Sequence, residues 1–109
     1  MFEPDTIQKR ALETWYAADD PRRHELTHPI LKLAGEAGEL ANLHGKDLYK
    51  PGFKAELFAY LDELGDAFYY IAILAYQLGV TIDELSQMNY EKLKEREDNG
   101  TGYNRGNPK

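Results

Sequence analysis

Cysteine is absent from the 109-residue sequence, which excludes disulfides, thiolate nucleophiles and cysteine metal sites. Long apolar runs are absent as well. The longest, AFYYIAILAY at residues 67–76, has 10 residues, about half of the roughly 20 that a membrane-spanning helix needs. The N-terminal MFEPDTIQKR contains no apolar segment of the kind found in signal peptides. We therefore expect a cytoplasmic protein with no membrane partner.

Basic residues are in short supply: the chain has 13 Lys and Arg against 19 Asp and Glu, a formal net charge of −6. Proteins that bind nucleic acid normally present a basic face, so we expect no nucleic-acid partner. An acidic chain is still able to bind a small anion when a cation bridges the two. The positions of the acidic residues therefore decide which function the sequence supports.

Strand-like alternation, internal repeats and a second domain are not visible in the sequence, whereas helical spacing of apolar residues recurs along it. Between residues 57 and 78, apolar residues alternate spacings of four and three, which predicts a seam that packs against other helices. The expected helices cover residues 5–18, 27–44, 57–78 and 81–97, with a loop at 45–52. The sequence therefore predicts an all-α four-helix bundle, with a single helical domain at residues 1–97 and a flexible C-terminal tail at 98–109.

Local signals mark the boundary between the last two expected helices. Gly79 follows the third apolar segment at the position where glycine commonly ends a helix. Thr81 and Glu84 have the spacing of a capping box, in which each side chain accepts a hydrogen bond from the backbone N–H of the other. The fourth helix is therefore expected to begin just after Thr81.

Two pairs of acidic residues are spaced three apart on the expected helices. Residues 35–42 read GEAGELAN, which places Glu36 and Glu39 on one side of the second helix. Residues 62–68 read DELGDAF, which places Glu63 and Asp66 on one side of the third. Lys32 is the only basic residue four positions away from any of these acids. The usual explanation, solvated acids paired with Lys or Arg, therefore fits them poorly.

Carboxylates that face one another repel unless they are protonated or bind a cation. Hard divalent cations prefer oxygen ligands, and Mg²⁺ typically bridges carboxylates to substrate phosphates. We therefore expect Mg²⁺ at this site, with Mn²⁺ as the alternative. Gly35 and Gly38, with Gly65 on the facing helix, are expected to allow a close approach between the two helices.

A di-iron centre is disfavoured, because such bundles need Glu-x-x-His on each of two helices. Only Glu25 and His28 have that spacing. His44 is expected to pack or to form a hydrogen bond rather than to bind a metal.

The acidic motifs and their surroundings resemble the MazG-like all-α nucleotide pyrophosphohydrolases. The resemblance rests on E-x-x-E at Glu36 and Glu39, followed after 23 residues by E-x-x-D at Glu63 and Asp66. The contexts LAGEAGELAN, DELGDAFYYIAILAYQLGVTIDEL and NYEKLKER match as well. The similarity covers most of the chain, from about residue 26 to about residue 96.

The resemblance implies Mg²⁺-dependent hydrolysis of a nucleoside triphosphate between the α and β phosphates, which yields a monophosphate and pyrophosphate. It also implies a role in house-cleaning or nucleotide-pool control. Four motif acids would be the metal ligands and catalytic residues: Glu36, Glu39, Glu63 and Asp66. One of them would alternatively orient or deprotonate the attacking water.

The resemblance further implies residues that bind the substrate phosphates. Asn89 and Lys92 match the family's N-x-x-K-L pattern, and Arg96 follows about one turn later on the same side. Lys46 lies after the first acid pair, where relatives often carry basic residues. Together these four side chains are the candidate substrate-binding residues.

Members of this family are dimers or tetramers, so the resemblance implies a homo-oligomer. The segment AFYYIAILAY agrees, because it is more apolar around its circumference than a monomeric bundle of this size requires. Gln8 matches an early Gln of the family, whereas EDNGTGYNRG at residues 97–106 departs from the family's short R-Y-P-x-G-F-like ending. The preferred base and sugar therefore stay open.

Two other functions are compatible with the sequence. One is a phosphoribosyl-ATP pyrophosphohydrolase, which is similar in fold but which the N-x-x-K-L element disfavours. The other is a non-catalytic oligomer that binds nucleotide or metal, for which a lost motif acid would be evidence. No motif acid is lost.

Overall fold

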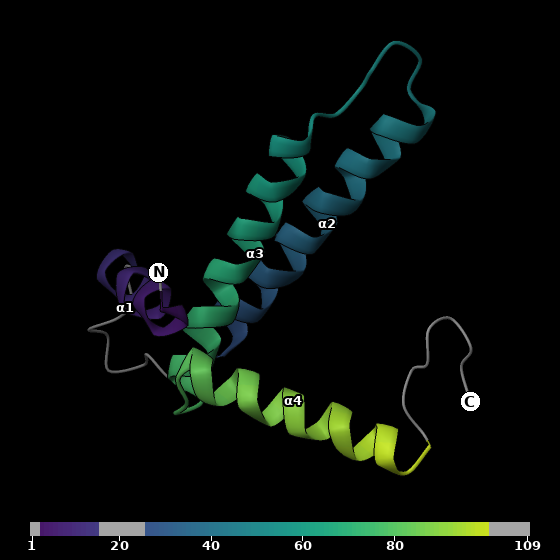
Figure 1. Cartoon of the computed structure of the whole chain (residues 1–109). Coiled ribbons are helices and arrows are strands. Elements are labelled where there is room, and N and C mark those ends of the chain that lie inside the picture. The colour runs from purple at the N-terminus through teal and green to yellow at the C-terminus, as the bar shows by residue number, and fades with distance from the viewer. Residues whose placement is uncertain (1–2, 16–25, 101–109) are drawn as a thin grey trace.

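The structure, a computed structural model, describes residues 3–15 and 26–100, and this part of the chain is all-α with short connections (Figure 1). It contains four helices: α1 (Pro4–Thr14), α2 (Thr27–Tyr49), α3 (Leu57–Gln77) and α4 (Ile82–Asp98). None of these helices is long and apolar enough to cross a membrane. The predicted all-α fold class is confirmed.

Two helix ends differ from the sequence prediction. α1 ends at Thr14, and residues 16–18 of its predicted range lie outside the described part of the chain. α2 continues to Tyr49, so the loop expected from residue 45 begins only at Lys50. The helix stops there because Pro51 follows and Gly52 adopts a left-handed backbone conformation with φ +80°. The predicted C-terminal tail lies outside the described residues from 101 onward.

The connection between α2 and α3 is held by one carboxylate. Asp47 Oδ1 accepts a hydrogen bond from the Ala55 backbone N–H at 2.9 Å, and Oδ2 accepts one from the Tyr60 hydroxyl at 2.8 Å. These two hydrogen bonds hold the pKa of Asp47 below its usual value, and the bond from the Ala55 backbone N–H has the larger effect. His44 Nδ1 lies 2.9 Å from the same Tyr60 hydroxyl. The expectation that His44 forms a hydrogen bond is confirmed.

The capping box before α4 is also confirmed. Thr81 Oγ1 accepts a hydrogen bond from the Glu84 backbone N–H at 3.0 Å, and Glu84 Oε1 accepts one from the Thr81 N–H at 2.9 Å. Gly79 has φ +88°, a conformation that glycine adopts without the strain of a Cβ. The chain therefore ends α3 and starts α4 with two locally specified turns.

The buried core lies where α1 packs against the C-terminal half of α3 and the start of α4. Its buried apolar residues are Ala11, Trp15, Ala72, Ile73, Ala75 and Ile82. Gln8 is buried among them, and its side-chain amide donates to the carbonyl oxygens of Ala72 at 3.1 Å and Val80 at 3.0 Å. The Asp5 carboxylate accepts a hydrogen bond from the backbone N–H of Asp83 at 2.9 Å. Polar contacts from α1 therefore set the direction in which α4 leaves the core.

The four helices do not form the closed bundle that the sequence predicts. α2 and α3 form an antiparallel hairpin, α1 packs against α3, and α4 contacts α1 and α3 but not α2. Figure 1 shows α4 pointing away from the hairpin. The radius of gyration is 17.0 Å, against about 13 Å for a compact domain of this size.

Within the predicted seam of α3, other helices cover Ile71 and Ala75, whereas the last seam residue, Leu78, is exposed. Ala75 is buried and Ile71 half-buried, whereas Leu57, Leu61 and Leu64 in the first half of the helix are exposed. The apolar segment at residues 67–76 includes the buried face that α1 covers, so much of its apolar surface is used within the chain.

Replacing Gln8 with Ala should lower the free energy of unfolding by about 1–3 kcal/mol, because two carbonyl groups lose their hydrogen-bond donor. The variant should show this as a lower midpoint in urea unfolding followed by circular dichroism. Gln87→Ala is the matched control, since the Gln87 side chain is exposed and bonds only to Glu91 on its own helix. Equal midpoints for the two variants would contradict a structural role for Gln8.

Candidate metal centre

Three of the four predicted acids converge between α2 and α3. Glu36 on α2 and Glu63 and Asp66 on α3 each offer a carboxylate oxygen, and these three oxygens lie within 4.8 Å of one another. The antiparallel hairpin produces this meeting, because residues three apart on α3 share a side that faces one turn of α2. Glu36 and Glu63 are half-buried and Asp66 is exposed. The cluster therefore lies at the edge of the helix interface, with one side open to water.

Glu39, the fourth predicted acid, is not part of this group of oxygens. Its side chain is exposed on α2, one turn after Glu36. Its charge nevertheless raises the pKa of both Glu36 and Glu63. The structure thus brings three predicted ligands together and leaves the fourth beside them.

Burial and mutual repulsion disfavour the charged form of the carboxylates in the cluster. Partial burial raises the pKa of Glu63 above its usual value, and the neighbouring carboxylates of Glu36 and Glu39 raise it further. Burial also raises the pKa of Glu36, with Asp66 as its strongest charged neighbour, while Lys32 opposes the shift. A cation bound between these groups would remove the repulsion.

One atom of the cluster is left without a partner. Glu63 Oε2 is buried and has no hydrogen-bond partner among the described residues. A buried carboxylate oxygen is costly unless a hydrogen bond or a cation satisfies it. Oxygen-only donors of this kind suit Mg²⁺ or Mn²⁺ rather than a soft metal. The residues present therefore fit the cation that the sequence predicts.

The glycines between the acids do not have the role predicted for them. A Cβ placed on Gly35, Gly38 or Gly65 would meet no other atom within 4 Å. These positions lie on outer surfaces of the hairpin, away from the contact between α2 and α3. The prediction that they allow the two helices to approach closely is therefore wrong for the described chain.

The candidate phosphate-binding residues lie away from the acidic cluster. Asn89, Lys92 and Arg96 are all on α4, which makes no contact with α2. Lys46 is helical rather than in a loop, and it lies ten residues after Glu36 on α2, about 15 Å along the helix axis. The described chain therefore does not bring these four residues to the acids.

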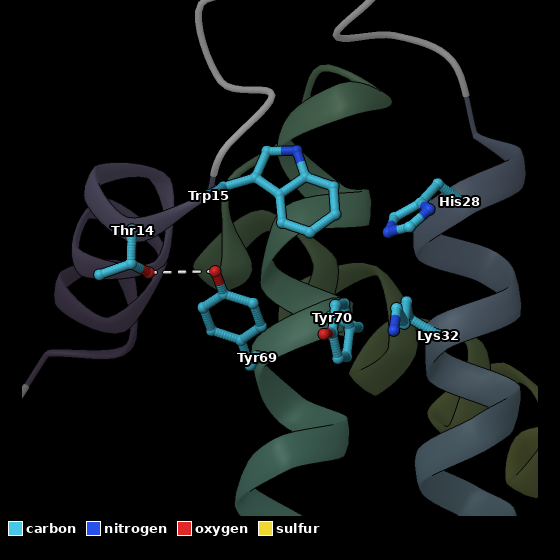
Figure 2. Close-up of a pocket in the computed structure, with 6 residues that line it drawn as sticks. All are labelled: Thr14, Trp15, His28, Lys32, Tyr69 and Tyr70. Atoms are coloured by element: carbon cyan, nitrogen blue, oxygen red, sulfur yellow. Dashed lines mark hydrogen bonds between the residues drawn. The ribbon is translucent and has the colours of Figure 1, made fainter.

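A pocket that the sequence analysis did not find adjoins the cluster. Its volume is about 430 Å³, and it is lined by Thr14, Trp15, His28, Lys32, Tyr69 and Tyr70 (Figure 2). The ring centroid of Trp15 lies 5.5 Å from that of His28 and 6.1 Å from that of Tyr70, and the ring planes of Trp15 and Tyr70 are nearly perpendicular. The Tyr69 hydroxyl lies 3.0 Å from Thr14 Oγ1, which ties α1 to α3 beside the pocket.

The pocket and the acidic cluster follow one another along the same side of the hairpin. Lys32 precedes Glu36 by one turn of α2, about 6 Å along the axis, and Tyr70 follows Asp66 by one turn of α3. The spacing of Lys32 and Tyr70 from the acids is visible in the sequence. The contribution of Trp15 is not, because it depends on where α1 packs.

Comparison with known proteins places the chain in a family. The chain is 40% identical over 81 residues to the Gene 37 protein of Mycobacterium phage L5, an alignment that covers 69% of this chain and 68% of that protein. The chain belongs to the Gene 37 protein family. No protein-family model and no solved structure matches it. Membership in the Gene 37 family identifies a phage relative, and the name of that relative states no activity.

Glu63→Gln should raise the thermal midpoint of the metal-free protein at pH 7. The pKa of Glu63 is raised in the folded chain, so the folded state holds this proton more tightly than the unfolded state does. Stability therefore falls as pH rises through the range between the unfolded and folded pKa values, and the neutral Gln avoids that loss. Below about pH 3, where the carboxyl is protonated in both states, the gain should disappear.

The measurement is a series of thermal melts with a chelator present, followed by circular dichroism. Glu95→Gln on α4 is the matched control, because Glu95 is exposed and distant from the cluster. A midpoint for Glu63→Gln at or below that of the parent at pH 7 would show that the cluster is not under electrostatic strain.

Proposed function

We propose that this protein is a Mg²⁺-dependent nucleoside triphosphate pyrophosphohydrolase related to the MazG-like enzymes. It would hydrolyse ribo- or deoxyribonucleoside triphosphates between the α and β phosphates, as a cytoplasmic homo-oligomer that acts in house-cleaning or nucleotide-pool control. The observation that carries the proposal is the cluster of Glu36, Glu63 and Asp66, with a buried Glu63 oxygen that lacks a partner. A phage relative is compatible with this role, because replicating phage DNA consumes deoxynucleotides.

The proposed reaction needs no covalent intermediate. Water attacks the α phosphorus, the bond to the α–β bridging oxygen breaks, and pyrophosphate leaves with that oxygen. A bound Mg²⁺ supplies charge neutralisation and a more acidic water. Glu36, Glu63 and Asp66 would hold the cation, and Glu39, which is exposed one turn after Glu36, would orient or deprotonate the attacking water.

The adjoining pocket supports a nucleotide substrate. Trp15, Tyr69 and Tyr70 provide aromatic surface, and nucleobases stack or make edge contacts on such surfaces. Lys32 lies between this pocket and the acids, where a cation would meet the triphosphate. We therefore place the base in the pocket and the phosphates at Lys32 and the metal. Asn89, Lys92, Arg96 and Lys46 remain candidate phosphate contacts from the sequence, but Lys32 is the basic residue nearest to the site.

The purified protein with Mg²⁺ should convert one or more nucleoside triphosphates to the monophosphate and pyrophosphate. A panel of ribo- and deoxyribonucleotides, with the products separated chromatographically, measures this directly. Glu63→Gln should lower kcat by at least about 100-fold, since even indirect supports of a metal ligand are worth 10–100-fold. Orthophosphate as the first product would exclude cleavage between the α and β phosphates. Hydrolysis of phosphoribosyl-ATP alone, or binding without turnover, would favour the alternative functions.

Lys32→Ala should raise KM for the nucleotide by about tenfold or more while changing kcat less. A charged contact to phosphate contributes about 1.5–3 kcal/mol, and 1.4 kcal/mol corresponds to a factor of ten in affinity. Lys9→Ala, which removes an exposed lysine from α1, is the matched control and should leave both constants unchanged. An unchanged KM in Lys32→Ala would remove Lys32 from the proposed site.

A further inference from the structure

Two hydroxyl groups in contact with each other line the aromatic pocket. The Tyr69 hydroxyl lies 3.0 Å from Thr14 Oγ1, and both residues are part of the pocket wall. A hydroxyl has one proton to donate and two lone pairs with which it accepts. The direction of the hydrogen bond between the two hydroxyls therefore decides what the pair offers to a bound ligand.

The Thr14 hydroxyl donates its proton to the backbone of α1. Thr14 Oγ1 lies 3.0 Å from the carbonyl oxygen of Ala11 and 3.5 Å from that of Arg10, and a carbonyl oxygen only accepts. Ala11 belongs to the last turn of α1, where carbonyl oxygens have no N–H partner within the helix. Because the single Thr14 proton is used there, the Tyr69 hydroxyl is the donor in its bond to Thr14.

Both hydroxyl protons are thus used within the chain, whereas lone pairs remain on both oxygens. Thr14 Oγ1 accepts one hydrogen bond from Tyr69 and has a second lone pair, and the Tyr69 oxygen has two. Within the described part of the chain, this hydroxyl pair therefore offers acceptors and no proton to a ligand. Such a pair binds an N–H or O–H group and repels a carbonyl oxygen.

The hydroxyl pair and Lys32 lie at opposite ends of the pocket. Figure 2 shows Thr14 and Tyr69 on one side of the Trp15 indole and Lys32 on the other. The indole nitrogen lies on the edge of the ring that is turned away from the Tyr69 hydroxyl. A nucleotide whose phosphates lie at Lys32 and the acids therefore presents the far edge of its base to the hydroxyl pair.

We propose that this pair selects nucleotides whose base carries an exocyclic amine at its far edge, namely cytosine and adenine nucleotides. The amine N–H donates to a lone pair of Tyr69 or Thr14. In uracil and hypoxanthine, a keto oxygen replaces the amine and meets those lone pairs with its own. The inference rests on the nucleotide substrate proposed above and names the class of its base.

The expected discrimination corresponds to one hydrogen bond. Cytosine and uracil, like adenine and hypoxanthine, differ at this edge in the exchange of an amine for a keto oxygen and in the protonation of the adjacent ring nitrogen. Thr14 is exposed and Tyr69 half-buried, so water competes for part of the effect. The amine member of each pair should bind about fivefold to tenfold more tightly.

The test is a fluorescence titration of the full chain with nucleoside monophosphates in the presence of Mg²⁺. Trp15 is the only tryptophan in the sequence, so quenching of its emission reports a ligand in the pocket without any turnover. Cytidine monophosphate should bind about fivefold to tenfold more tightly than uridine monophosphate, and adenosine monophosphate should exceed inosine monophosphate by a similar factor. Equal affinities within either pair, or no quenching by any of the four, overturn the proposal.

Thr14→Val tests the direction of the hydrogen bond between the two hydroxyls. The variant removes the acceptor of the Tyr69 proton, which becomes available to a keto oxygen. The uridine and inosine nucleotides should therefore bind more tightly than they bind to the parent, and the preference within each pair should vanish or reverse. A purely structural role of Thr14 would weaken all four nucleotides by one factor, and an unchanged preference overturns the proposal.

Tyr69→Phe decides the matter if Thr14→Val loses helix content by circular dichroism. It removes acceptor lone pairs and frees no proton, so it should weaken the cytidine and adenosine nucleotides and leave the other two unchanged. Tyr90→Phe is the matched control, because the Tyr90 side chain is 66% exposed on α4 and lies outside the pocket. It should keep the parental preference, and a parental preference in Tyr69→Phe as well overturns the proposal.

The titration and the product assay separate the two proposals. A protein that prefers cytidine and adenosine nucleotides but releases no pyrophosphate from any triphosphate refutes the proposed function alone. A protein that releases pyrophosphate but binds the two members of each pair equally refutes the role of the hydroxyl pair alone.

Discussion

The antiparallel contact between α2 and α3 is the constraint on which the rest of the structure depends. It brings acids from two distant segments of the chain to within 4.8 Å of one another, and it divides the hairpin into two sides. One side carries the acids and the aromatic pocket, and the other is uncharged and apolar. Since Glu36 lies on α2 and Glu63 and Asp66 lie on α3, any change in how these two helices pack alters the acidic cluster.

The acidic cluster represents a compromise between folding and chemistry. Partly buried carboxylates with raised pKa values weaken the folded chain when no cation is bound. The core beneath α1 compensates from a distance, since its buried apolar residues and the Gln8 hydrogen bonds do not involve the acids. The core thus lies at one end of the hairpin, while the acids with raised pKa values lie near its middle.

Local features of the fold were predictable from the sequence because they depend on neighbouring residues. The capping box at Thr81 and Glu84 and the turn at Gly79 follow from side chains within a few positions of one another. Three of the four acids were paired correctly across two helices, because their i,i+3 spacing indicates which side of each helix they occupy.

Features that depend on how helices pack were not predictable in the same way. The direction of α4 is set by contacts from Gln8 and Asp5, residues more than 70 positions away from its first turn. The aromatic pocket likewise needs Trp15 at the end of α1, whose partner surface no periodicity specifies. The prediction that Gly35, Gly38 and Gly65 bring the two helices close together was wrong, because a small residue permits a close approach without requiring one.

The hydrogen bonds of Asp47 have a consequence for the acids three turns away. By joining Ala55 and Tyr60 to the end of α2, this carboxylate fixes the axial register of the two helices. A slip of one helical turn would displace Glu63 from Glu36 by about 5.4 Å, more than the spacing within the cluster. The hydrogen bonds at the closed end of the hairpin therefore help to keep the carboxylates of Glu36 and Glu63 at the same height along the two helices.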